Sequence, residues 1–235
     1  MGKHLLREIE NLKKKIIALG VMVKNMIEKA MYSLEERNKE LAEEVIEEDK
    51  KIDEKEVELE EECLKVLALY QPVAKDLRFI VAVMKINNDM ERIGDLAVNI
   101  AERAAYLATQ PKIEIPFDLK QMTKEATSML KKSLDAFVNS DVMLALEVCK
   151  TDDVVDEYNR EMFYCIQDEI RRDISKMELL IHILMISRHL ERIADLATNI
   201  AEDVVYMVEG EIMRHKTEDF SKKEKRKIPK YSKVD

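Results

Sequence analysis

Tryptophan is absent from this sequence of 235 residues, and glycine, proline and phenylalanine are scarce, with four, four and five residues. Folds rich in sheets or loops need many more glycines and prolines for their turns. The prolines stand only where helical patterns break, at Pro72, Pro111, Pro116 and Pro229. These scarcities exclude a β-rich fold and predict an all-α chain of long helices.

Long apolar runs and an excess of basic residues are also missing. The longest apolar stretches cover residues 79–84 and 179–186, far short of the length that spans a bilayer, so we expect no membrane span. Lysine and arginine total 39 against 48 aspartates and glutamates, which gives a net charge of −9. This balance argues against direct binding to nucleic acid, which needs a basic surface.

Cysteine is rare as well, with three residues, Cys63, Cys149 and Cys165, and no CxxC spacing. An odd number without such spacing predicts reduced thiols in the core rather than disulfides or a structural zinc site. The N-terminal residues are charged and helical in pattern, unlike a signal peptide. We therefore expect a cytoplasmic protein.

The apolar residues that are present follow helical spacing. From Leu5 to Ala30 they alternate steps of four and three, which is typical of a helix in a bundle. Arg37 and Asn38 end this first helix. Five more helices are predicted over about residues 39–69, 72–109, 118–138, 141–172 and 176–213, with Pro72 in the first turn of the third helix and a linker at 111–116.

The two halves of the chain are copies of each other. Residues 91–102, ERIGDLAVNIAE, return 100 positions later as ERIADLATNIAE, with ten of twelve residues identical. Asp49 and Asp53 have counterparts in Asp152 and Asp156. The repeat predicts two tandem three-helix bundles, residues 1–110 and 116–213. Residues 214–235 follow as a basic tail with nine Lys or Arg against four acids, which we interpret as solvated.

The repeated dozen, residues 91–102 and their copies 191–202, carries acidic and amide side chains on one helix face. Within about 80° of helix circumference lie Glu91, Asp95, Asn99 and Glu102, and their copies are Glu191, Asp195, Asn199 and Glu202. Asp49 and Asp53 stand about as far before the expected turn near Pro72 as Asp95 and Glu91 stand after it, so the four carboxylates should lie at one level. Asp152, Asp156, Glu191 and Asp195 repeat this arrangement.

Carboxylates so close together repel unless a cation lies among them, either a metal ion or Arg92 and Arg192. Ligation by carboxylates alone suits Mg, Mn, Ca or ferric iron, with Zn possible. The Glu-x-x-His motif of ferritin-type di-iron sites does not occur. We interpret His182 and His189 as core residues. A solvated acidic face laced with Glu–Arg pairs is the alternative.

A family resemblance is carried by the strings NNDMERIGDLAVNIAE, SRHLERIADLATNIAE, EEDKKID and QPVAKDLRFI. They resemble the PhoU family, regulators that accompany the phosphate-specific ABC transporter, and the resemblance covers about residues 5–213. The resemblance implies two three-helix bundles with multinuclear metal clusters, iron among the metals. Carried over residue by residue, the metal positions are Asp49, Asp53, Glu91, Asp95, Asp152, Asp156, Glu191 and Asp195, with Asn99, Glu102, Asn199 and Glu202 within reach.

The resemblance further implies a homodimeric negative regulator of phosphate uptake and of phosphate-responsive signalling, not an enzyme. Its expected partners are the transporter ATPase and the phosphate-sensing histidine kinase. His189 in place of Asp89, and Ala194 in place of Gly94, leave open whether both sites bind the same metal. Two alternatives remain from the residues alone: a carboxylate-bundle metalloenzyme (oxidase or phosphohydrolase), and a helical adaptor without metal.

Overall fold

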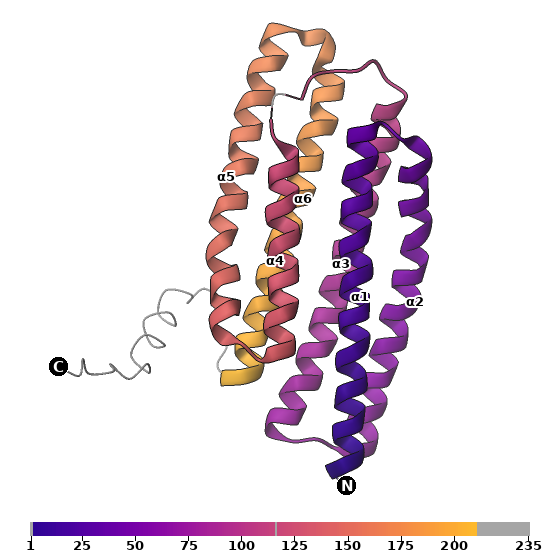
Figure 1. The fold of residues 1–235 in the computed structure, drawn as a ribbon, viewed down its shortest axis with the longest axis vertical. Coiled ribbons are helices and arrows are strands. Elements are labelled where there is room, and N and C mark those ends of the chain that lie inside the picture. Colours follow the sequence, from indigo (N-terminus) through magenta and orange to yellow (C-terminus); the bar gives the residue numbers. More distant parts are fainter. Residues whose placement is uncertain (1, 116, 211–235) are drawn as a thin grey trace, which may run out of the picture.

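A computed structural model describes residues 2–115 and 117–210. Within these ranges the chain forms six long helices and one short 3-10 turn, Ile174–Lys176 (Figure 1). The long helices are α1 (Gly2–Glu36), α2 (Lys39–Tyr70), α3 (Ala74–Ala108), α4 (Leu119–Asn139), α5 (Val142–Arg172) and α6 (Met177–Glu209). The predicted tail 214–235, and the predicted continuation of the last helix to residue 213, lie outside the described residues.

The helices form two three-helix bundles, α1–α3 and α4–α6, that lie side by side (Figure 1). The predicted all-α fold with internal duplication is therefore confirmed. Each bundle has a buried apolar seam, which runs through Ile86, Ile93 and Ile100 in the first half and through their copies in the second. The exact domain limits, 1–110 and 116–213, stay a prediction.

Side chains that bind free backbone groups set the helix ends. The carboxylate or amide oxygens of Asn38, Asp118 and Asp141 accept the backbone N–H three residues later, which starts α2, α4 and α5. Gly210 ends α6 with a φ of 77°, a conformation in which glycine avoids the strain of a side chain.

The start of the third helix differs from the prediction. Pro72 does not occupy the first turn, because Val73 is extended with φ −128° and ψ 161° and the helix begins at Ala74. Gln71 ends α2 in the left-handed conformation. The chain therefore uses residues 71–73 to reverse direction before α3 can begin.

Helices α3 and α6, which carry the repeated dozen, are the central pair that joins the bundles (Figure 1). They run antiparallel, so a residue near the start of one lies beside the end of the other. Arg78 Nε donates to the Met207 carbonyl oxygen at 3.2 Å, and Lys85 Nζ lies 2.6 Å from an Asp203 carboxylate oxygen. The two copies are thus related by an approximate two-fold axis between α3 and α6.

His189 belongs to this central contact, as the interpretation of a core histidine requires. Arg103 Nε donates to His189 Nε2 at 3.3 Å, and the histidine is 7% exposed. Burial, followed by the nearby charge of Arg103, lowers the pKa of His189 to about 4, so the ring is neutral at physiological pH. The histidine that replaces Asp89 therefore packs the two bundles together.

Within the described residues, no helix combines the length and the apolar character needed to cross a bilayer.

Candidate metal centres

The first candidate centre gathers carboxylates from α2 and α3. Asp49 and Asp53 lie one turn apart on α2 and face Glu91 and Asp95 on α3. Burial raises the pKa of Asp49 to about 6, and the charges of Asp53 and Asp95 raise it further. Burial, Asp95 and Asp53 raise the pKa of Glu91 in the same direction. The acids of α2 therefore lie beside those of α3 along the bundle, as their distances from the turn predicted.

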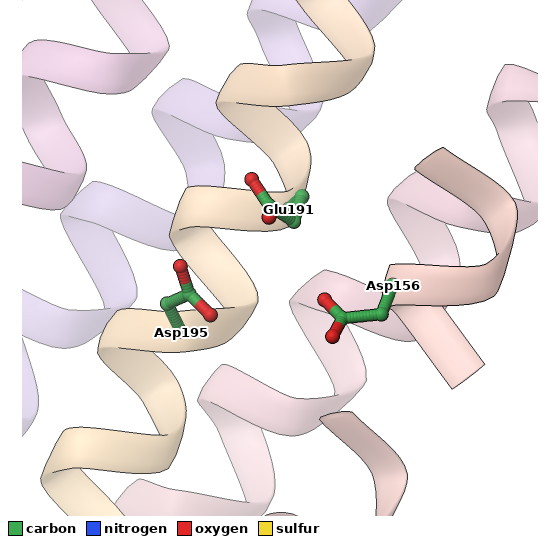
Figure 2. Close-up of side chains that lie close together, drawn as sticks. All are labelled: Asp156, Glu191 and Asp195. Atoms are coloured by element: carbon green, nitrogen blue, oxygen red, sulfur yellow. The ribbon is translucent and has the colours of Figure 1, made fainter. Parts of the chain in front are cut away.

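The second candidate centre repeats this arrangement between α5 and α6. Asp156, Glu191 and Asp195 each have one carboxylate oxygen within 4.8 Å of one in each of the other two. Figure 2 shows these three side chains, with Asp156 on α5 facing the two acids on α6. Burial, Asp195 and Asp156 raise the pKa of the adjoining Asp152 to about 6. Asp152 adjoins these three acids, which are the only group of three in the described part of the chain whose carboxylate oxygens come this close together.

Two substitutions between the copies make the centres unequal. Gly94 has no side chain, and a Cβ there would lie 3.3 Å from an Asp49 oxygen, so Asp49 packs against the α3 backbone. Ala194 occupies the equivalent place on α6. Thr198, which replaces Val98, donates its hydroxyl to Asp152 at 3.2 Å. Asp152 is thus held by a hydrogen bond, whereas Asp49 is held by close packing.

The electrostatics of both centres favour bound cations. The groups with a raised pKa are Asp49, Glu91 and Asp95 in the first centre and Asp152, Glu191 and Asp195 in the second. A raised pKa means that negative charge is unfavourable on that group, and a cation would offset this cost. Arg92 was a candidate for that role, but its Nη1 pairs with Asp89, on the side of α3 that faces α6, at 3.8 Å. The other candidate, Arg192, does lower the pKa of Asp195, but burial and Asp156 raise this pKa more. The donor set consists of carboxylate oxygens from two helices, which fits hard cations such as Mg²⁺, Mn²⁺ or ferric iron.

The four remaining predicted residues lie at the edges of these centres. The Asn99 amide donates to the backbone carbonyl of Asp95 at 2.7 Å, and Asn199 is exposed. Glu202 lies near Cys149, whose pKa burial raises to about 12, and it also lines a groove between α2, α3 and α6. Glu102 is exposed two turns beyond Asp95. Ligand roles for these four stay a prediction.

A pocket between the two centres was not predicted from the sequence. It has a volume of about 320 Å³ and is lined by four residues of α3 and their four copies on α6: Arg92, Asp95, Leu96, Asn99, Arg192, Asp195, Leu196 and Asn199. All eight belong to the repeated dozen. The missing information was the antiparallel contact of α3 with α6, which are not consecutive helices.

A family model described as the PhoU domain matches the chain twice, over residues 16–104 and 119–204. The chain belongs to the PhoU family. Each matched PhoU segment contains one complete carboxylate centre, Asp49 to Asp95 in the first and Asp152 to Asp195 in the second. The duplicated acids are therefore part of the duplicated PhoU domain rather than an addition to it.

Similar proteins cover nearly the whole chain. The phosphate-specific transport system accessory protein PhoU homolog of Aquifex aeolicus is 40% identical over 211 residues, which is 90% of this chain and 96% of the relative. PhoU homolog 1 of Thermotoga maritima is 37% identical over 212 residues, 90% of this chain and 91% of the relative. The crystal structure of PhoU from Pseudomonas aeruginosa matches with a TM-score of 0.83 at 34% identity, covering 87% of this chain and 99% of that one.

Proposed function

We propose that this chain is a cytoplasmic accessory protein of a phosphate-specific transport system that restrains phosphate uptake and phosphate-responsive signalling by binding other proteins. The observation that supports this most is the match, over 90% of this chain, to relatives named as accessory proteins of such a system. The expected partners are the ATPase subunit of the phosphate ABC transporter and the phosphate-sensing histidine kinase. The proposed working form is a homodimer.

The two carboxylate centres are the proposed metal sites of this regulator. Asp49, Asp53, Glu91 and Asp95 would hold one site and their counterparts the other. A bound cation supplies positive charge and links α2 to α3, or α5 to α6. The side chains contribute oxygen ligands, and Thr198 orients Asp152 for that purpose. Iron is the proposed metal by family resemblance, and the donor set also suits Mn²⁺ and Mg²⁺.

Elemental analysis tests the metal sites. The full chain is purified without chelator or nickel resin, beside a variant carrying Asp53→Asn, Glu91→Gln, Asp156→Asn and Glu191→Gln. We expect metal in the native chain and a loss of most of it in the folded variant. A control with four exposed acids neutralised elsewhere, Glu10, Glu36, Glu54 and Glu161, removes the same charge and should retain its metal.

The regulatory role is tested by direct binding to the purified transporter ATPase and to the cytoplasmic part of the kinase. We expect saturable binding of one or both, and binding should change when metal is removed. Failure to bind either protein, with the chain folded and metal-loaded, would contradict the proposal. Light scattering on the same samples measures the mass, which should be that of a dimer.

A further inference from the structure

The pocket between α3 and α6 presents charged hydrogen-bond donors and acceptors in pairs. Arg92 and Arg192 supply guanidinium N–H groups, and Asp95 and Asp195 supply carboxylate oxygens. Its volume of about 320 Å³ is at the small end for ligand pockets, which suits a small polar molecule. This combination differs from a simple acidic cluster, because the positive and negative side chains are equal in number.

The donors suit an oxyanion. Arginine binds phosphate-type oxygens through paired, charge-assisted hydrogen bonds. Among the described residues, the ion pair of Arg92 is a long one, 3.8 Å to Asp89, and its guanidinium lines the pocket. Asn99 and Asn199 add two amide groups to the same wall, although one N–H of Asn99 is used by the Asp95 carbonyl.

The carboxylates restrict which oxyanion fits. Asp95 and Asp195 accept hydrogen bonds and repel a ligand that offers them only negative oxygens. Inorganic phosphate at neutral pH still carries at least one proton, and the O–H group that holds it can donate a hydrogen bond to a carboxylate. Sulfate carries none at that pH and can only accept. A pocket lined by both arginine donors and carboxylate acceptors therefore distinguishes phosphate from sulfate, although the two ions have nearly the same size and shape.

Symmetry supports the same ligand. The pocket lies on the approximate two-fold axis, so each contact from α3 has a counterpart from α6. A tetrahedral ion itself has two-fold axes and can make equivalent contacts to both helices. We propose that this pocket binds inorganic phosphate in preference to sulfate, with Arg92 and Arg192 donating hydrogen bonds to its oxygens and with Asp95 or Asp195 accepting a hydrogen bond from its P–O–H group. The proposal extends the proposed function by giving the regulator a direct phosphate site.

Calorimetry or equilibrium dialysis on the full chain tests this, with metal removed by a chelator so that no ion binds phosphate. We expect phosphate to bind at least about tenfold more tightly than sulfate, because sulfate leaves the carboxylates without a donor. Arg192→Gln should weaken phosphate binding about tenfold or more. Arg188→Gln is the matched control, an exposed arginine one turn earlier on α6 that does not line the pocket, and it should bind phosphate like the native chain.

The double variant Asp95→Asn, Asp195→Asn tests the selectivity separately. It removes the acceptors and their charge, so sulfate should now bind about as well as phosphate. Circular dichroism serves as the control that each variant is folded. Equal affinity of the native chain for both anions, no phosphate binding at millimolar concentration, or an effect of Arg188→Gln equal to that of Arg192→Gln would overturn the proposal.

The metal sites and the phosphate pocket share Asp95 and Asp195, but the two proposals are tested by separate measurements. Metal content and ATPase binding are measured without phosphate, so a chain that binds metal and ATPase but no phosphate refutes only the phosphate site. A chain that binds phosphate but neither metal nor ATPase refutes only the regulator.

Discussion

Replacing Asp49 with asparagine should have opposite effects with and without metal. The pKa of Asp49 is raised from 3.8 to about 6, first by burial and then by Asp53 and Asp95. For a completely buried carboxylate, a pKa shift of this size would correspond to about 3 kcal/mol of unfavourable free energy in the charged folded state. Asp49 is only half-buried, so solvent screening reduces the figure to about 1 kcal/mol. Asparagine has the same shape without the charge.

The metal-free variant should therefore be more stable than the native chain by about 1 kcal/mol at neutral pH. The difference should shrink as the pH falls from about 6 towards 3.8, because the folded native chain then gains a proton at Asp49 that the unfolded chain still lacks. With saturating Mn²⁺ the order should reverse, since the variant has lost a ligand and gains less stability from the ion.

Urea unfolding with chelator, and again with Mn²⁺, measures both effects. The dependence of the unfolding free energy on urea concentration (the m-value) should be the same for the variant and the native chain. Glu54→Gln is the control, because Glu54 is an exposed acid on the same helix and should shift neither curve appreciably. Destabilisation of the metal-free chain by Asp49→Asn, or an equal shift with and without Mn²⁺, would refute the reasoning.

Three further predictions concern packing. Phe137→Ala should cost about 3–5 kcal/mol in urea unfolding, because this ring is 1% exposed on α4 and stacks on a phenylalanine of α3 in the other bundle. Gly94→Ala should raise metal-free stability by about 0.5 kcal/mol through helix propensity, yet weaken metal binding at the first centre in titrations, because the new methyl group displaces Asp49. Arg103→Met should raise the pKa of His189 above 4, which NMR titration of the ring detects; an unchanged pKa would contradict the contribution of the Arg103 charge.

The carboxylate centres could be predicted because their geometry is local. Consecutive antiparallel helices place residues opposite each other at equal distances from the turn, so Asp53 faces Glu91 once the turn near Pro72 is known. A small error in that turn did not matter, although the helix began at Ala74. The surroundings of Glu202 were less predictable, because this residue of α6 lines a groove with residues of α2 and α3, which belong to the other bundle.

The position of Arg92 could not be predicted from contacts between neighbouring helices. From the sequence, Arg92 is a candidate cation among the acids of the first centre, whereas in the structure it pairs with Asp89 and lines the inter-bundle pocket. His189 is similar: its replacement of Asp89 was visible in the repeat, but its partner Arg103 lies 86 residues away on another helix. The Arg92–Asp89 pair is an i,i+3 contact that helix periodicity allows, but the inter-bundle pocket and the contact of His189 with Arg103 depend on how α3 packs against α6.

The sequence by itself therefore determined the all-α class, the duplication and the two sets of facing acids, since apolar spacing, scarce turn residues and repeat offsets act within a helix or between neighbouring helices. Only the tertiary structure decided that α3 and α6 meet antiparallel along an approximate two-fold axis. That docking depends on the summed packing of both bundles rather than on any local pattern. It brings residues 92–99 beside 192–199 and so creates the pocket between the two centres.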